Sequence, residues 1–237
     1  TAPVSSLVAT LGFVVLAVGA QAPIAFVIAF IPMLFIAFAY RELNRAVPDC
    51  GTTFTWGTKA FGPWVGWMGG WGVAVAGMVV LANLAQIASI YFWALFGLEF
   101  ENNDWRILLV AVAFIAAMTW VSWRGVEIGE RIQNILLAIQ YLALAIFVVA
   151  ALWQFFGGTA PNPTPFDIAW LNPFGFADWS GFTEAVLLAL FIYWGWDTCL
   201  ALNEETKDPK RTPGRAALLT TVILLVTYVS VTIAAMM

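Results

Sequence analysis

Five long stretches without a charged side chain divide this chain of 237 residues. They cover residues 1–40, 60–98, 107–123, 132–166 and 216–237. Each is about as long as, or longer than, the roughly 20 apolar residues with which an α-helix crosses the hydrocarbon core of a bilayer. Inside lipid the backbone must satisfy its own hydrogen bonds, which a helix does within one segment. The sequence therefore predicts an all-α, polytopic helical membrane protein.

Composition supports this fold class and narrows the function. Hydrophobic residues make up 62% of the chain and charged residues only 10%, whereas about a quarter of a soluble domain is charged. The absence of histidine removes the usual haem and di-iron ligands and any histidine proton relay. Cys50 and Cys199 fall in a predicted loop and a predicted helix, so we expect no disulfide. We expect no cofactor, no metal site and no nucleic-acid partner.

Glycines, prolines and charged loops divide the apolar stretches into about seven transmembrane helices. Residue 214 begins the last of them, and Gly195 interrupts the sixth. The first six helices are expected at residues 4–18, 24–40, 64–96, 107–122, 130–155 and 181–203. The chain begins without methionine and stops inside an apolar stretch, so we expect a fragment truncated at both ends.

The distribution of basic residues predicts how these helices cross the membrane. If successive loops lie on alternate sides of the membrane, nine of the ten lysines and arginines fall on one side and only Arg106 falls on the other. Cytosolic loops carry the excess of basic residues in membrane proteins. We therefore expect a multi-pass protein of the plasma membrane, with the loops between helices 2 and 3, 4 and 5, and 6 and 7 in the cytosol.

The sixth apolar stretch contains the sequence Trp194-Gly195-Trp196-Asp197. Asp197 is the ionisable residue expected nearest the middle of a span, where a charge usually faces the bundle interior or a water path. The alternative is a carboxylate at the end of a helix. Gly195 allows backbone conformations that a side chain would forbid. We favour Trp194 and Trp196 as a gate or pocket wall over an interfacial belt.

Two further patterns can be understood from helix structure alone. Residues 1–6 combine a proline with two serines, which suits a second helix break or an ordinary helix start, because proline favours the first turn. Gly62, Gly66 and Gly70 follow a GxxxG spacing, which lets helix backbones approach closely. We expect these three glycines to serve packing.

Three separated motifs resemble those of amino acid permeases in the amino acid–polyamine–organocation superfamily. Residues 48–56 with 60–71 resemble the family's loop between helices 2 and 3, although Cys50 stands where the family usually has a glycine. Residues 125–134 resemble the entry to helix 5, and residues 204–213 resemble the segment after helix 6. Because the motifs follow one another in the family's order, the resemblance covers the whole chain.

The resemblance implies a leucine-transporter-like fold of two inverted five-helix repeats in one continuous membrane domain. The first repeat would cover residues 1–155, an extracellular loop residues 156–180, and the start of the second repeat residues 181–237. Helices 1 and 6 would be unwound at mid-membrane and hold the substrate. The implied substrate-binding residues are Ala2, Pro3, Val4, Ser5, Ser6, Tyr193, Trp194, Gly195, Trp196 and Asp197.

The implied function is a secondary active transporter, not an enzyme, that moves amino acids or related amines by alternating access. Several relatives carry a coupling lysine in helix 5, where this chain has Gln140. A neutral amide supplies no fixed charge, so H⁺ and Na⁺ both stay open as the coupling ion. A polyamine or organic-cation exchanger of the same fold is an alternative, and a seven-helix receptor is an alternative of another class.

Overall fold

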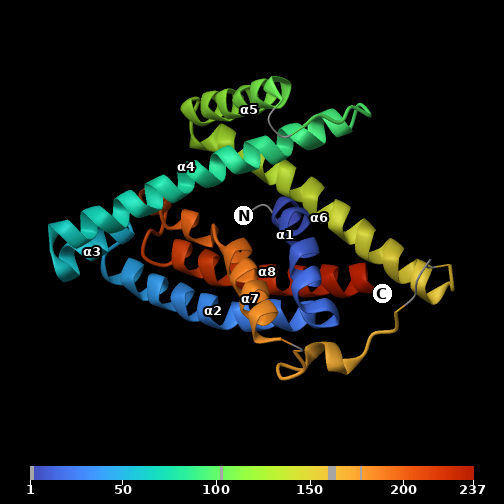
Figure 1. The fold of residues 1–237 in the computed structure, drawn as a ribbon. Coiled ribbons are helices and arrows are strands. Elements are labelled where there is room, and N and C mark those ends of the chain that lie inside the picture. Colours follow the sequence, from blue (N-terminus) through green and yellow to red (C-terminus); the bar gives the residue numbers. More distant parts are fainter. Residues whose placement is uncertain (1–2, 102–103, 160–163, 177) are drawn as a thin grey trace. The chain divides into compact units, whose positions relative to one another are not determined.

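The computed structural model describes residues 3–101, 104–159, 164–176 and 178–237 (Figure 1). Within these ranges the chain forms α-helices joined by short 3₁₀ turns, and no β-strand is present. The predicted all-α class is confirmed. The chain divides into two compact units, of which unit 1 comprises Thr1–Thr52 with Ile139–Met237 and unit 2 comprises Thr53–Ala138.

Four helices lie wholly within unit 1 and pack on one another. They are α1 (Pro3–Val18), α2 (Ala22–Ala46), α7 (Trp179–Tyr193) and α8 (Thr212–Met236). A 3₁₀ turn, η1 (Gly19–Gln21), separates α1 from α2 at the predicted place, and Gly19 takes a φ of +57° there. Helix α2 packs along α8 and also against α7, and α7 packs against α1.

Small residues bring the helices of unit 1 close together. Ala25, Ala29, Ala185 and Ala189 are all fully buried. A Cβ atom at Gly181 of α7 would collide with the Ala17 carbonyl oxygen of α1. Without a side chain between them the two backbones approach closely, as is usual between helices in membranes. The remaining core is filled by larger apolar side chains on all four helices.

Unit 2 is built on α3 (Thr53–Phe61), α4 (Pro63–Ala94) and α5 (Trp105–Trp123). Gly66 and Gly70 of α4 face Phe54 of α3, which confirms the packing role predicted for these two glycines. Gly62 instead caps α4 with a φ of +94° and has no atom within packing reach of a Cβ, so its role is to turn the chain. The buried Ser89 hydroxyl ties α4 to α5 through a 2.7 Å hydrogen bond to the Ile107 carbonyl.

Three element boundaries differ from the sequence predictions. Helix α3 lies between the helices expected at residues 24–40 and 64–96, where none was predicted, and α2 continues beyond its expected end as far as Ala46. The helix expected over residues 181–203 is wrong in its second half, because α7 ends at Tyr193. Two 3₁₀ turns follow, η3 (Trp196–Cys199) and η4 (Asn203–Glu205). A third turn, η2 (Ile168–Leu171), lies in the expected loop. The division into repeats stays a prediction.

Helix length and apolar composition agree with a membrane protein. Among the described residues, five helical segments are long and apolar enough to cross a bilayer. They are Ser6–Ala46, Pro63–Ala94, Trp105–Trp123, Ile128–Phe156 and Thr212–Met236. The fourth belongs to α6 (Val126–Phe156), which begins in unit 2 and ends in unit 1. Many of their large apolar side chains point outward, as lipid-facing or protein-covered surfaces require.

Replacing Gly66 by alanine tests the packing of α3 on α4. The added Cβ would lie 2.6 Å from the Phe54 carbonyl oxygen and 2.6 Å from the Thr58 nitrogen. Overpacking of this kind typically costs about 1–3 kcal/mol, so Gly66→Ala is expected to lower the thermal unfolding temperature. The control is Gly72→Ala in the same helix, where the Cβ meets no atom within 4 Å. Equal unfolding temperatures for the two variants would refute the close contact.

Candidate functional site

The site is built around the end of α7. Trp194 adopts an extended conformation (φ −63°, ψ 153°), and Gly195 follows with a φ of +104° and a ψ of −5°. The left-handed conformation disfavours any residue with a Cβ and is routine for glycine. The predicted interruption near Gly195 is therefore present as a sharp end to the α-helix, followed by the 3₁₀ turn η3.

A helix that ends inside an apolar bundle leaves carbonyl groups without intrahelical partners. The Trp194 N–H donates to the Phe191 carbonyl at 3.2 Å. The Tyr228 hydroxyl of α8 donates to the Ile192 carbonyl at 2.8 Å. The Tyr193 hydroxyl donates in turn to the Phe26 carbonyl of α2 at 3.2 Å. Two tyrosines thus connect the end of α7 to α8 and to α2.

The rings of these tyrosines form a buried aromatic cluster with Phe26. The Tyr193 and Tyr228 ring centroids lie 5.1 Å apart, nearly edge to face, and those of Phe26 and Tyr228 lie 5.9 Å apart. All three side chains are fully buried. Tyr193 was predicted from the sequence as a site residue, whereas Phe26 and Tyr228 were not. The available signal was a tyrosine in the apolar run of α8, because a buried tyrosine hydroxyl usually finds a hydrogen-bond partner.

The start of α1 reaches the same cluster. Ser6 shares a side-chain hydrogen bond with Tyr228, the residue that holds the Ile192 carbonyl. Pro3, Val4 and Ser5 lie in the first turns of α1, as an ordinary helix start would have them, and Ala2 lies outside the described residues. One residue from each of the two predicted binding segments, Ser6 from residues 2–6 and Tyr193 from residues 193–197, thus contacts Tyr228.

Trp196 serves packing beyond the break. Its side chain is only 4% exposed and meets Tyr40 of α2 edge to face, with ring centroids 5.3 Å apart. Ala37, Leu200 and Ala217 complete this second buried cluster. Trp194 is half-buried, and its ring centroid lies 6.4 Å from that of Phe191. The two tryptophans therefore have different surroundings, and Trp194 is the more accessible of them.

Three of the residues predicted for the site carry a buried polar atom without a partner. The Asp197 Oδ1, the Trp196 Nε1 and the Gln140 Oε1 are all buried, and within the part of the chain that is described none has a hydrogen-bond partner. A buried polar group left unpaired costs about 1–3 kcal/mol, and native proteins rarely keep one without a reason. A bound polar ligand, an ion or a water would supply the missing interaction.

Two buried asparagines hold the segment after the break. The Asn203 Nδ2 donates to the Asn44 Oδ1 at 2.8 Å, and the Asn44 Nδ2 donates to the Pro209 carbonyl at 2.7 Å. Both side chains are fully buried. This chain of hydrogen bonds fixes the region of η4 to the last turns of α2. The segment that follows the break is thus anchored to the bundle at a second point.

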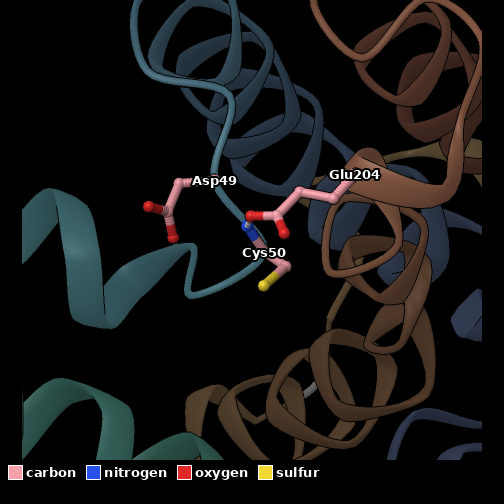
Figure 2. Close-up of side chains that lie close together, drawn as sticks. All are labelled: Asp49, Cys50 and Glu204. Carbon is pink, nitrogen blue, oxygen red and sulfur yellow. Dashed lines mark hydrogen bonds between the residues drawn. The ribbon is translucent and has the colours of Figure 1, made fainter.

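Asp49, Cys50 and Glu204 form the one group of potential metal ligands found among the described residues (Figure 2). Their ligand atoms lie within 4.8 Å of one another, and Cys50 and Glu204 are exposed. The Cys50 backbone N–H donates to the Glu204 Oε1 at 3.1 Å. The side-chain hydrogen bond with the Glu204 carboxylate raises the pKa of the Cys50 thiol. Because the thiolate is the metal-binding form, this arrangement does not favour a metal.

Comparison with known proteins places the whole described chain in one family. The family model described as amino acid permease matches residues 2–237. The chain belongs to the amino acid permease family. This confirms the resemblance found in the three sequence motifs. No solved structure matches the chain significantly.

Curated relatives agree with this assignment. The low-affinity putrescine importer PlaP of Escherichia coli K12 is 29% identical over 85% of this chain and 43% of its own length. The branched-chain amino acid permease BcaP of Lactococcus lactis is 26% identical over 84% of this chain and 44% of its own. A putative arginine/ornithine antiporter of E. coli K12 is 26% identical over 85% of this chain and 44% of its own. The chain thus spans less than half the length of these relatives, and all three are named as transporters rather than enzymes.

Two of the three family motifs, at residues 48–56 and 204–213, are in contact in the structure. The loop carrying Asp49 and Cys50 meets the segment that begins at Glu204, through the hydrogen bond from Cys50 to Glu204. The asparagine chain from Asn203 to Asn44 and Pro209 lies beside the same two segments in the sequence. The motifs therefore mark the structural support of the break rather than the break itself.

Replacing Tyr228 by phenylalanine tests the support of the α7 end. The change keeps the ring and removes the donor to the Ile192 carbonyl, leaving a buried acceptor unpaired at a cost of about 1–3 kcal/mol. We expect a lower unfolding temperature for the purified protein in detergent. Tyr91→Phe is the matched control, because Tyr91 is 54% exposed and such surface changes stay within about 0.5 kcal/mol. A Tyr228→Phe protein as stable as Tyr91→Phe would contradict the account.

Proposed function

We propose that the whole protein is a secondary transporter that carries amino acids or related amines across the plasma membrane. Its substrate would bind at the broken centres of helices 1 and 6 and be released by alternating access. Two observations support this: membership of the permease family and the end of α7 at a left-handed Gly195. The second carries most weight, because non-helical backbone at membrane depth is tolerated only within protein or beside a cavity.

The chemistry of helix ends explains how such a break would hold an amino acid. The last carbonyls of α7 form the negative end of its dipole, which suits an ammonium group. The first N–H groups of α1 form a positive end, which suits a carboxylate. Ser6 near that start and Ile192 near the α7 end both contact Tyr228. A zwitterion between them would find both charges matched by backbone, as in other transporters with broken helices.

Asp197 is the residue we assign to the substrate amine or to the coupling ion. It lies two residues after Gly195, and its Oδ1 is buried without a partner among the described residues. The resemblance implies a coupling lysine in helix 5 of several family members where this chain has the neutral Gln140, so Asp197 supplies the carboxylate at the proposed site. The coupling ion, H⁺ or Na⁺, would then be sensed by a carboxylate rather than by an amine.

A polyamine or organic-cation exchanger is the second candidate. The unpaired Asp197 oxygen favours it, because a diamine has no carboxylate of its own and needs an anionic partner. The relative PlaP is named as a putrescine importer. An amino acid would use both helix ends, whereas a diamine would depend mainly on Asp197 and the α7 carbonyls.

Uptake by Gly195→Leu tests the position of the substrate site. Leucine disfavours the left-handed conformation by roughly 1–2 kcal/mol and adds bulk at the break. We expect saturable uptake of radiolabelled amino acids or putrescine by the whole protein in vesicles, and its loss in this variant. The control is Gly12→Leu in α1, where a Cβ meets no atom within 4 Å. Unchanged substrate affinity in Gly195→Leu would contradict substrate binding at the break.

The role of Asp197 is tested by removing its charge. Asp197→Asn keeps the size of the side chain, and we expect uptake to fall about tenfold or more because a charge-assisted hydrogen bond contributes about 1.5–3 kcal/mol. Glu205→Gln removes a charge from a nearby exposed side chain and should transport normally. A panel of amino acids and diamines, with and without sodium and a pH gradient, then separates the two candidates. Equal uptake by both variants would exclude Asp197 from the site.

A further inference from the structure

Four arginines line a cavity of about 330 Å³ in unit 1. Arg41 and Arg45 lie near the end of α2, and Arg211 and Arg215 lie at the start of α8. None of the residues assigned to the substrate site lines this cavity. It therefore needs an explanation of its own.

The charges in the cavity are not balanced by the protein. One carboxylate, that of Glu42, pairs with two arginines: the Arg41 Nη2 at 2.7 Å and the Arg45 Nη1 at 3.1 Å. Within the described residues neither Arg211 nor Arg215 has an ion-pair partner. Three positive charges are thus in excess, and the positive end of the α8 dipole points to the same place. The complementary ligand is an anion.

The helices bring these arginines together by close packing. A Cβ atom at Gly214 of α8 would lie 2.5 Å from the Arg41 Cγ and 3.2 Å from the Arg41 Cα. Arg211 and Arg215, three and one residues away from Gly214 in sequence, are four residues apart and share a helix face. The absence of a side chain at Gly214 therefore sets the width of the cavity.

The position of the cavity along the helices indicates what kind of anion. Residues 22–40 of α2 and 216–236 of α8 carry no charge, and both helices belong to segments able to span a bilayer. The arginines stand where these apolar parts end, which is the level of lipid headgroups. The Arg41 guanidinium lies 5.1 Å from the Phe38 ring centroid, and the exposed Leu219 lies one turn after Arg215. An acyl chain would find apolar surface beside the cavity.

We propose that the cavity binds the phosphate group of an anionic phospholipid. Arginine guanidinium groups match phosphate oxygens with paired hydrogen bonds, and basic pockets between transmembrane helices are known to hold such headgroups. The acyl chains lie along exposed apolar side chains such as Phe38 and Leu219. The bound lipid bridges the end of α2 to the start of α8, so it stabilises the helix that carries Tyr228.

The test measures lipid retained by the whole protein. Protein purified in a neutral detergent is titrated with phosphatidylglycerol or phosphatidylcholine, and bound lipids are counted by native mass spectrometry. We expect preferential retention of phosphatidylglycerol and a loss of affinity of about tenfold or more in Arg211→Gln/Arg215→Gln. The matched control, Lys207→Gln/Lys210→Gln, removes the same charge from exposed residues of the preceding segment that do not line the cavity. It should bind like the wild type.

Each other outcome overturns the proposal. Equal weakening in the two double variants means diffuse attraction between charges rather than a site. If inorganic phosphate raises the unfolding temperature as much as phosphatidylglycerol does and displaces it, the ligand is a soluble anion. Binding of neither anion means that the cavity holds another part of the protein. If Arg211→Gln/Arg215→Gln fails to fold, Arg215→Gln alone is measured against Lys210→Gln under the same criteria.

Discussion

The hydrogen bond from the Tyr228 hydroxyl to the Ile192 carbonyl is the interaction on which the centre of unit 1 depends. A helix that ends inside an apolar bundle exposes carbonyl groups that lipid cannot satisfy. Tyr228 supplies a donor from α8, and Tyr193 extends the connection to the Phe26 carbonyl of α2. The break at Gly195 is thus a supported feature of the packing.

The rest of unit 1 keeps this break in place from both sides. Before it, α7 lies close against α1 because Gly181 leaves room for the Ala17 carbonyl. After it, Trp196 packs on Tyr40 and the Asn203–Asn44 hydrogen bond fixes the following turns to α2. Tertiary contacts thus anchor the chain up to Tyr193 and again from Trp196. The short stretch between, with Trp194 half-buried and Gly195 left-handed, is where a ligand could approach the backbone.

The length of the uncharged apolar stretches was enough to predict the long helices, whereas the short helix α3 (Thr53–Phe61) was not predicted. The break was predictable from Gly195, since a glycine close to an aspartate in an apolar run favours a helix end over a continuous span. The partners of the break were not predictable: Tyr228 and Phe26 look like ordinary residues of apolar helices until the fold brings them to Tyr193. The same holds for the 3₁₀ turns after Gly195, because nothing in residues 196–202 marks the hydrogen bond from Asn203 to Asn44 that holds this segment to α2.

The arginine cavity is lined by residues of α2 and from the start of α8, and the same two helices hold the end of α7 through Phe26 and Tyr228. A change in the packing of these two helices would therefore alter both the cavity and the end of α7. The central claim remains that the substrate binds at the break. Its most direct test is a cryo-electron microscopy structure of the whole protein with a transported amino acid or amine bound. The account predicts ligand density against residues 193–197, beside Tyr228. A continuous helix through Gly195, or ligand density elsewhere in the bundle, would contradict it.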